Sequence, residues 1–390
     1  MNGSIDEQIT VLVAGDFAPV GNVEKLCVTQ ENNCGKSLFG DAQSVLEDKD
    51  FSIVNLECPL TVKTNPISKC GPCIKSDPAS INLLKHASFD AVALANNHIF
   101  DQGAEGLNDT LELCKINKIK VVGAGKNLLH ASEPLTCTIK DKTLSIINIA
   151  ENEFSIASAD SPGANPLDPV KNYTQITKAK AESDYVIVIL HGGNEYYPLP
   201  SIRMRDTCRF FADIGADAVL VHHSHVPGGY EVYNNTPIFY GLGNFIFPSL
   251  KRDGATNDWF NGYFVKLYLT GGEKVDFEIY PYSQCKDELD FKLLEGTRKL
   301  DFLSRLNGYK KIVQDDQLLQ EEWMRFADEN RIDYMSYFMM MNIYKRQLFK
   351  RNIFVDKILP KEKLRYVLNV IRCESHRDAV LSAIEETLSE

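Results

Sequence analysis

Short apolar runs alternate with amphipathic segments from residue 9 to about residue 280. Each run consists mostly of Val, Ile, Leu, Ala or Phe, a composition typical of strands buried on both faces. The predicted strands are residues 9–14, 51–55, 91–94, 120–122, 144–149, 185–190, 218–221 and 238–240. Residues 106–117 and 203–214, which lie between such runs, carry apolar side chains at helical spacing. This alternation predicts an α/β layered domain.

The last part of the chain has a different pattern. Residues 261–269 and 274–282, separated by Gly271-Gly272, predict a β-hairpin that closes the domain. After residue 283 strand-like runs vanish, and Glu, Lys, Arg, Leu and Met dominate. We therefore expect a first domain over residues 1–283 and a helical region over 284–390, with a break at Leu359-Pro360. These helices are the expected place for a partner or for self-association, if the chain has either.

Charge narrows the classes of partner. The 390 residues carry a formal net charge of −11. Nucleic-acid binding needs a concentrated basic surface, so this balance argues against it. An anionic small molecule or polymer stays compatible, because a bound metal reverses the local field. The polar N-terminus lacks the features of a secretory signal, and no apolar stretch is long enough to span a membrane, so the expected location is cytoplasmic.

Cys70-Gly71-Pro72-Cys73 has the spacing of a thioredoxin redox centre. Such a centre opens a helix directly after a strand, whereas polar segments that contain proline flank this one. Three interpretations stay open, namely a redox pair, a structural zinc site shared with Cys27 and Cys34, and an ordinary loop. The ordinary loop is favoured.

Candidate metal ligands recur where the predicted strands end, which is where open α/β sheets build their sites. They are Asp16, Glu57, Asn97 with His98 and Asp101 close by, His191, and His223 with His225. A strand-end Asp alone is often a helix cap, and a lone buried His is more often a hydrogen-bonded core residue than a ligand. Five successive strand ends with carboxylates, an amide and imidazoles give a stronger signal. They predict one or two divalent metal ions, with zinc, manganese and iron as alternatives.

Several longer motifs contain these residues. They are Gly15-Asp16, Asn55-Leu56-Glu57-Cys58-Pro59-Leu60-Thr61, Leu94-Ala95-Asn96-Asn97-His98-Ile99-Phe100-Asp101-Gln102-Gly103, Gly123-Ala124-Gly125, His222-His223-Ser224-His225 and Tyr240-Gly241-Leu242-Gly243-Asn244-Phe245. The order of these motifs resembles that of the calcineurin-like metallophosphoesterases. Their residues are similar to those of the capsule and poly-gamma-glutamate synthesis branch (CapA, PGA_cap). The resemblance covers about residues 9–250. It implies a four-layer α/β/β/α sandwich, here with a helical C-terminal extension.

The resemblance also implies a role for each candidate. In a two-metal centre, Glu57 would bridge the ions, Asn97, His191 and His223 would complete one site, and Asp16 and His225 would serve the other. His98 would protonate the leaving oxygen or stabilise developing charge. Asp101 would orient His98, as carboxylates next to a metal centre commonly orient imidazoles.

Two departures from the family pattern bear on these roles. The first motif of the superfamily is Asp-x-His, and here it is Asp16-Phe17-Ala18, so one ion loses an imidazole. The longer Glu57 replaces the usual bridging aspartate. The Asp16/His225 site is therefore expected to bind its metal more weakly than the other site.

Five further residues are candidates for substrate contact: Asn96, Glu195, Tyr196, Arg203 and His222. Glu195 and Tyr196 follow His191-Gly192-Gly193 and match a phrase of the family branch, with an ordinary loop as the equal alternative. Arg203 could bind a carboxylate or phosphate, although a surface salt bridge is the favoured alternative.

Two functions from different classes fit these patterns. The first is a metal-dependent hydrolase that cleaves a phosphoester or an amide and is linked to capsule or polyglutamate-type polymer metabolism. The second is a non-catalytic, metal-containing component of a polymer-synthesis complex that binds an anionic chain. Ala18 favours the second, whereas His98 and Asp101 favour the first, since neither is needed merely to hold a metal. The link to surface polymers rests on resemblance alone.

Overall fold

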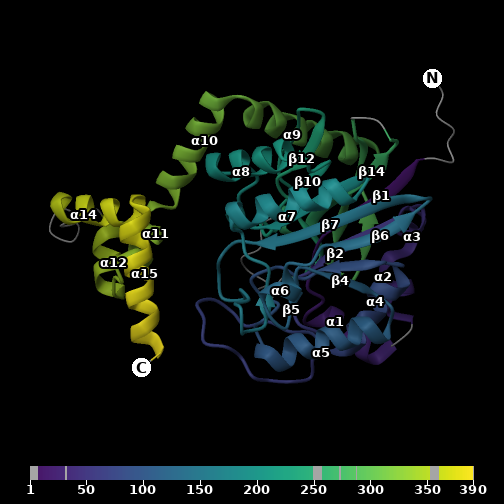
Figure 1. The fold of residues 1–390 in the computed structure, drawn as a ribbon, viewed down its shortest axis with the longest axis horizontal. Coiled ribbons are helices and arrows are strands. Elements are labelled where there is room, and N and C mark those ends of the chain that lie inside the picture. The colour runs from purple at the N-terminus through teal and green to yellow at the C-terminus, as the bar shows by residue number, and fades with distance from the viewer. Residues whose placement is uncertain are drawn as a thin grey trace. The chain divides into compact units, whose positions relative to one another are not determined.

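The computed structural model describes residues 8–30, 33–248, 257–271, 274–286, 288–351 and 360–389. The chain forms two compact units, residues 1–319 and 320–390. The first unit contains two stacked sheets with helices on their outer faces (Figure 1).

The first sheet has eight strands. In spatial order they are β16 (Phe291–Leu293), β15 (Asp276–Gln284), β14 (Asn261–Leu269), β1 (Ile9–Phe17), β2 (Phe51–Leu56), β3 (Ala91–Ala93) and β4 (Lys120–Val122), while β13 (Asn244–Ile246) pairs with the end of β1. Strands β1 to β4 are parallel to one another, and β14 runs antiparallel to β1. The carboxyl ends of β1, β2 and β3 therefore meet at one edge of the sheet.

The second sheet has six strands. In spatial order they are β11 (Tyr230–Tyr233), β12 (Thr236–Phe239), β10 (Ala218–His222), β9 (Tyr185–His191), β7 (Lys142–Ala150) and β6 (Leu135–Ile139). The four inner strands are parallel and the two edge strands antiparallel to their neighbours. Two short strands, β5 (Ala124–Gly125) and β8 (Gly163–Ala164), pair separately.

Helices cover the outer face of each sheet. The first sheet is covered by α1 (Asn22–Gln30), α2 (Cys34–Phe39), α4 (Ile81–His86) and α5 (Gly103–Ile116), with α3 (Gln43–Glu47) beside them. The second is covered by α7 (Pro169–Glu182) and α8 (Ile202–Asp213), and the short α6 (Leu128–Ala131) lies next to β5. Both covering helices of the second sheet start at a capping side chain, Asp168 for α7 and Ser201 for α8.

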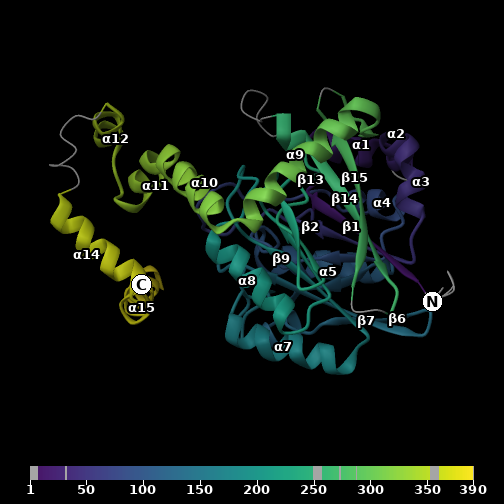
Figure 2. The same ribbon diagram turned by 90° about the horizontal axis from the view of Figure 1, so that it is seen from above.

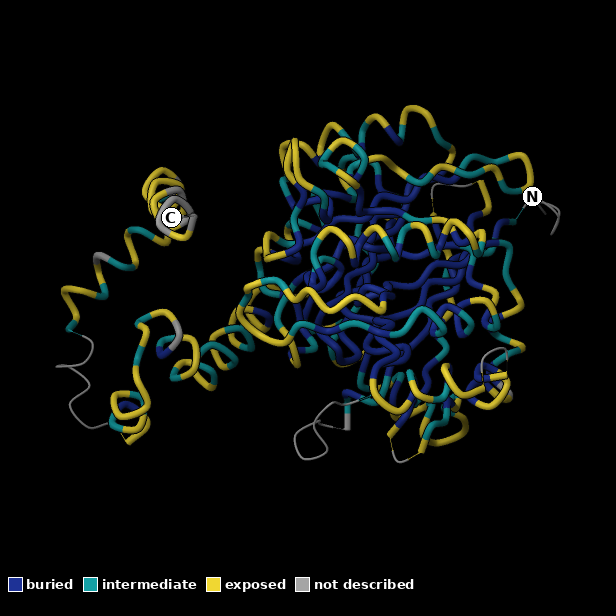
Figure 3. Tube along the Cα trace, turned by 90° about the horizontal axis from the view of Figure 1, so that it is seen from below, coloured by how far each residue is buried: buried dark blue, intermediate teal, exposed yellow. Residues whose placement is uncertain are grey.

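Alternation along the strands explains the layering. In β1, Ile9, Val11 and Val13 point into the core between the two sheets, whereas Leu12 and Ala14 point toward the helices. Both sets are fully buried, which is why the strand reads as a continuous apolar run. Figure 3 shows the same result for the whole unit, with the strands buried and the outer helices exposed on one side. The predicted four-layer sandwich is confirmed.

All eight predicted strands and both predicted helices are present, with boundaries that differ by a few residues. The hairpin is present as β14 and β15, and Gly272 of its expected turn lies outside the described residues. The sequence did not predict the edge strands β6 and β11 or the short β13 and β16. Strand β6 alternates between half-buried and exposed residues, so it lacks the continuous apolar run of the inner strands.

The first unit extends past the expected boundary at residues 283 and 284. Strand β16 adds to β15, and α9 (Gly296–Gln314) lies against β11 and β15 (Figure 2). Phe302, Leu306 and Val313 of α9 are buried, so this helix belongs to the first unit although its sequence is mostly polar.

The second unit is helical, as predicted for this region. The boundary between the units lies within α10 (Asp316–Glu329), after Leu319. The second unit contains the remainder of α10 together with α11 (Arg331–Phe338), α12 (Ile343–Lys350), α14 (Lys361–Arg372) and α15 (Glu374–Ser389). Helix α14 starts directly after Pro360, while Leu359 lies outside the described residues. No helix in the described ranges is both long enough and apolar enough to cross a bilayer.

Candidate metal centre

The predicted ligands gather where the strands of both sheets end. Asp16 lies in β1, Glu57 and Asn97 follow β2 and β3, His191 ends β9, and His223 and His225 follow β10. Gly15 lets β1 approach β13, because a Cβ at this residue would lie 1.9 Å from the carbonyl oxygen of Gly243. That close approach explains why a glycine precedes Asp16 in the Gly15-Asp16 motif.

Four side chains form a first ligand group. Nε2 of His191 lies 3.0 Å from Oδ1 of Asn97, 3.1 Å from Nδ1 of His223 and 3.5 Å from Oε1 of Glu57. Ligands bound at ~2.1 Å to one tetrahedral ion lie roughly 3.4 Å apart. The side chains are therefore already spaced as the ligands of a single metal ion.

Asp16, Glu57 and His225 form a second group around the same glutamate, with all ligand atoms within 4.8 Å of one another. Nδ1 of His225 contacts Oδ1 of Asn244 at 3.0 Å, so Nε2 is directed toward Oε1 of Glu57, 3.7 Å away. A carbonyl oxygen that fixes an imidazole in this way is typical of metal ligands.

The environment of the Glu57 carboxylate indicates whether these residues fit a metal ion. Its side chain is fully buried, and neither carboxylate oxygen has a hydrogen-bond partner. Burial, followed by repulsion from Asp16 and Glu195, raises the pKa of Glu57 well above its usual value. Buried carboxylates are normally paired or coordinate a cation. An ion held between the two groups would satisfy both oxygens, so the residues fit a divalent metal.

The neighbouring groups are suited to the same ion. Burial alone would raise the pKa of Asp16, but its interactions with His222, His225 and His191 lower the pKa below its usual value. Burial lowers the pKa of both His191 and His225, which favours the neutral form that can act as a metal ligand.

Residues 10–249 match the model of a family described as the bacterial capsule synthesis protein PGA_cap. The chain belongs to this family. This PGA_cap chain is 34% identical over 259 residues to the PGA biosynthesis protein CapA of Bacillus subtilis, covering 64% of this chain and 67% of that one. It is 29% identical to the capsule biosynthesis protein CapA of Bacillus anthracis, over 62% of this chain and 60% of that one. The match thus spans about two thirds or less of either Bacillus protein.

The match to a third relative spans a larger share of that relative's length. The probable polyglutamine synthesis accessory protein MT0602 of Mycobacterium tuberculosis is 27% identical, over 72% of this PGA_cap chain and 80% of that one. Among solved structures, the 5'-nucleotidase precursor from Thermus thermophilus aligns over 83% of this chain and 59% of that chain, with 12% identity and a TM-score of 0.37. At that level of structural similarity the family assignment rests on sequence.

His98 and Asp101 lie beside the ligand groups in this PGA_cap chain, outside both of them. Nδ1 of His98 lies 2.6 Å from Oδ2 of Asp101, which is fully buried. A buried lysine that the sequence analysis missed, Lys69, contacts the other oxygen of Asp101 and lies 3.1 Å from both Nδ1 of His98 and the carbonyl oxygen of Asn97. Because Nδ1 faces Asp101, Nε2 is the nitrogen of His98 that can donate a proton.

Replacing Lys69 by Met should lower the free energy of unfolding by about 3 kcal/mol, because Asp101 would keep its buried charge without a cation. Urea unfolding of the chelated protein measures this. Lys142→Met is the matched control, because Lys142 pairs with Asp184 at 3.3 Å on the surface and should cost less than about 1 kcal/mol. Equal losses in the two variants would show that Lys69 does not neutralise Asp101.

The substrate candidates separate into buried and exposed residues. Asn96 is fully buried and donates to the carbonyl oxygen of Leu56, and His222 is buried with Nδ1 3.1 Å from Oδ1 of Asp16. His222 therefore contacts a candidate ligand directly, whereas Asn96 is linked to Asp16 through Asn55. Glu195 and Tyr196 are exposed at the rim, and Arg203, which is exposed, pairs with Glu151, in keeping with the favoured salt bridge.

The cysteines do not form a shared metal site. Cys27 and Cys34 are buried, whereas Cys70 is exposed and Cys73 is half-buried. Within the described ranges, no group of three ligating side chains contains a cysteine, and all ten thiols are free. Cys70 and Cys73 belong to the loop that carries Lys69, and Oδ2 of Asp101 accepts from the backbone N–H of Ile74 in the same loop.

Asn55 is a second residue that the sequence analysis did not assign to the site. Its amide donates to Oδ1 of Asp16 at 2.8 Å and lies 3.2 Å from Nδ1 of His191, so it connects the two sheets beneath the metal centre. A signal was present, because Asn55 is an amide side chain near the end of a mostly apolar strand. Lys69 gave no such signal, since it lies in a loop without periodicity.

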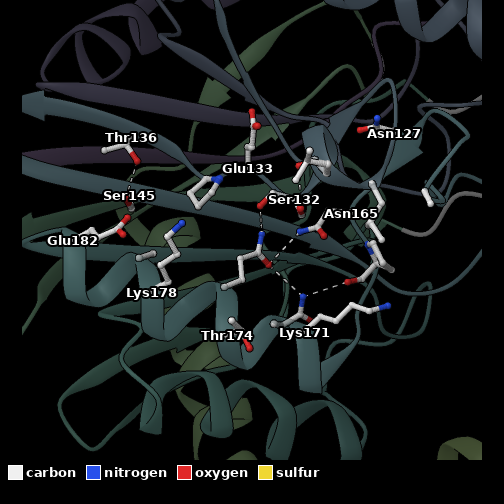
Figure 4. A pocket seen from close by; sticks show the side chains of 18 residues that line it. Asn127, Ser132, Glu133, Thr136, Ser145, Asn165, Lys171, Thr174, Lys178 and Glu182 are labelled. Carbon is white, nitrogen blue, oxygen red and sulfur yellow. Dashed lines mark hydrogen bonds between the residues drawn. The ribbon is translucent and has the colours of Figure 1, made fainter.

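A larger pocket of about 830 Å³ lies away from this centre, between α6, α7 and the edge of the second sheet. Figure 4 shows Thr136 and Ser145 on its sheet side, and Lys171, Thr174 and Lys178 of α7 opposite them. None of the candidate site residues lines it. A smaller pocket of about 370 Å³, lined by Glu151, Glu153 and Arg203 among others, lies next to the metal ligands.

Proposed function

We propose that this chain is a metal-dependent hydrolase that acts in capsule or polyglutamate-type polymer metabolism. The observation that carries the proposal is Glu57, a fully buried carboxylate without a hydrogen-bond partner, at the junction of two ligand groups. The PGA_cap family supplies the biological setting, and a cytoplasmic location stays part of the proposal.

The chain's own residues would divide the work. A divalent ion in this centre would lower the pKa of a bound water and stabilise the negative charge that develops on the substrate. Nε2 of His98 would donate a proton to the leaving oxygen or nitrogen. Asp101 would hold the His98 ring through its contact with Nδ1, and Lys69 would pair with the other oxygen of Asp101. The exposed Arg203 would face the substrate at the rim.

The substrate would be an anionic phosphoester or an amide within an anionic polymer. The second candidate function is a non-catalytic component that binds such a polymer, and the buried Ala18 favours it because the second ligand group lacks an imidazole there. In that case the helical second unit would bind a partner or a second copy of the chain.

The first experiment measures metal content per chain by elemental analysis, on protein purified without chelators and then incubated with manganese or zinc. We expect at least one ion per chain, lost in His191→Ala and His223→Ala because both rings belong to the first ligand group. His130→Ala is the control, since His130 lies on α6 and bonds to Asn127. The same samples are assayed on a phosphoester and on polyglutamate. A chain without metal under every loading condition would rule out the proposal.

A further inference from the structure

The second ligand group is one ligand short, and the loop after β9 supplies a candidate. Two residues after Asp16, where the resemblance implies an imidazole, the chain has the fully buried Ala18. A carboxylate oxygen of Glu195 lies within 4.8 Å of a ring nitrogen of His223 and one of His225. Glu195 thus lies near His225 of the second group and His223 of the first, and it is exposed, whereas Glu57 is buried.

The residue after Glu195, Tyr196, fixes the course of this loop. The backbone N–H of Tyr196 donates to the carbonyl oxygen of Ser224 at 2.8 Å, between His223 and His225. The ring of Tyr196 stacks on Trp259 at 5.6 Å, and Trp259 lies 4.8 Å from the ring of His225. The two loops are therefore joined through both backbone and side chains.

Three residues of these loops have an unusual backbone conformation. Tyr196, His223 and His225 have φ angles of 61°, 93° and 58°, in the left-handed region that non-glycine residues rarely adopt. Such strain persists where the surroundings require it, which is most often at functional sites. Here it presents the two imidazoles and the Glu195 carboxylate to one another.

Three carboxylates, those of Asp16, Glu57 and Glu195, lie near one another. In the described part of the chain, no lysine or arginine pairs with any of them. Glu57 is fully buried and its oxygens are unpartnered. A cation between these groups would satisfy Glu57 and offset the repulsion.

We infer that Glu195 is a further ligand of the ion that His225, Asp16 and Glu57 would hold, and that it compensates for the imidazole that Ala18 does not supply. This inference deepens the proposed function, since it concerns the same metal centre, but it does not require hydrolysis. Three carboxylates and one imidazole make an oxygen-rich site, which suits manganese better than the nitrogen-rich first group does.

Titration of the chelated full-length chain with Mn²⁺, followed by calorimetry and electron paramagnetic resonance, tests this inference. We expect two ions per chain in the unaltered protein, with a spectrum broadened by coupling between them. Glu195→Gln should keep the tighter ion, weaken the second at least tenfold and remove the coupling. Glu195→His should bind the second ion more tightly than Glu195→Gln, because an imidazole can again act as a ligand.

Glu153→Gln is the matched control. Its carboxylate lies 3.8 Å from Nε2 of His223 and is 37% exposed, yet it belongs to none of the ligand groups. It removes the same charge from the same rim, so both affinities should stay within about twofold. The inference is overturned if Glu195→Gln binds both ions as the unaltered protein does, if Glu153→Gln weakens the second ion equally, or if the unaltered protein binds only one ion. Two ions that depend on Glu195, without hydrolysis of any substrate, would instead count against the proposed function alone.

Discussion

Replacing His98 by Asn should reduce hydrolysis by about 10²–10⁴-fold, the usual contribution of a general acid, and leave metal binding unchanged. His98 belongs to neither ligand group, and its Nδ1 contacts Asp101, so we propose it as a proton donor rather than as a metal ligand. Asn keeps a polar side chain of similar reach but cannot protonate a leaving group. The measurements are kcat/KM on the best substrate and the number of Mn²⁺ ions bound per chain.

A second histidine provides the control for that experiment. His130→Asn alters an imidazole on α6 that bonds to Asn127, outside the metal centre, and should leave turnover within about twofold. Unchanged turnover in His98→Asn would refute the acid role of His98. Polyglutamate binding without hydrolysis, in both the unaltered protein and the variant, would favour the non-catalytic function.

Glu57→Gln should change the stability of the metal-free protein and of the metal-loaded protein in opposite directions. The folded pKa of Glu57 is raised above the unfolded value, so the metal-free protein loses stability as pH rises above about 4.5, the usual value of a glutamate. The neutral amide removes that loss and should raise the free energy of unfolding at pH 8 by roughly 1–2 kcal/mol. The variant also loses a ligand common to both groups, so Mn²⁺ should bind at least about 100-fold more weakly.

Glu231→Gln is a control that should change the stability of the metal-free protein in the opposite direction. Glu231 is as buried as Glu57, but Arg209 donates to both of its oxygens at 2.9 and 2.8 Å, and the Tyr240 hydroxyl donates at 2.7 Å. Glu231→Gln should therefore destabilise the metal-free protein and leave metal affinity unchanged. Urea unfolding at pH 5 and pH 8, with and without Mn²⁺, separates the two. A Glu57→Gln protein that is less stable than the parent without metal would contradict the account of Glu57 as an uncompensated charge.

The sheets and the ligands at their ends were predictable because burial on both faces leaves a plain signal. The inner strands are mostly apolar, so a charged residue or a histidine at a strand end, such as Asp16 or His191, stands out. The parallel order of the strands then brings those ends together. The same logic fails for β6, which is an edge strand with one half-exposed face.

The residues around the ligands could not be predicted in the same way. Lys69 and Glu195 come from loops, whose course depends on contacts between residues far apart in sequence, such as Tyr196 with Ser224. The side chain of Lys69 is only 2% exposed, which no local pattern indicates for a lysine between a serine and a cysteine. Helix α9 is a similar case, since three buried side chains fix it to the first unit within a sequence that is otherwise polar.

The position of β1 in its sheet also bears on how the protein acquires its metal during synthesis. Asp16 leaves the ribosome early, but β1 lies between β2 and β14, and the backbone of Asp16 bonds to Gly243 just before β13. The ligands from the second sheet, His191, His223 and His225, emerge much later. An ion that meets the growing chain therefore finds isolated carboxylates and no pocket. A metal bound as proposed would therefore meet its complete set of ligands only after these late strands are in place.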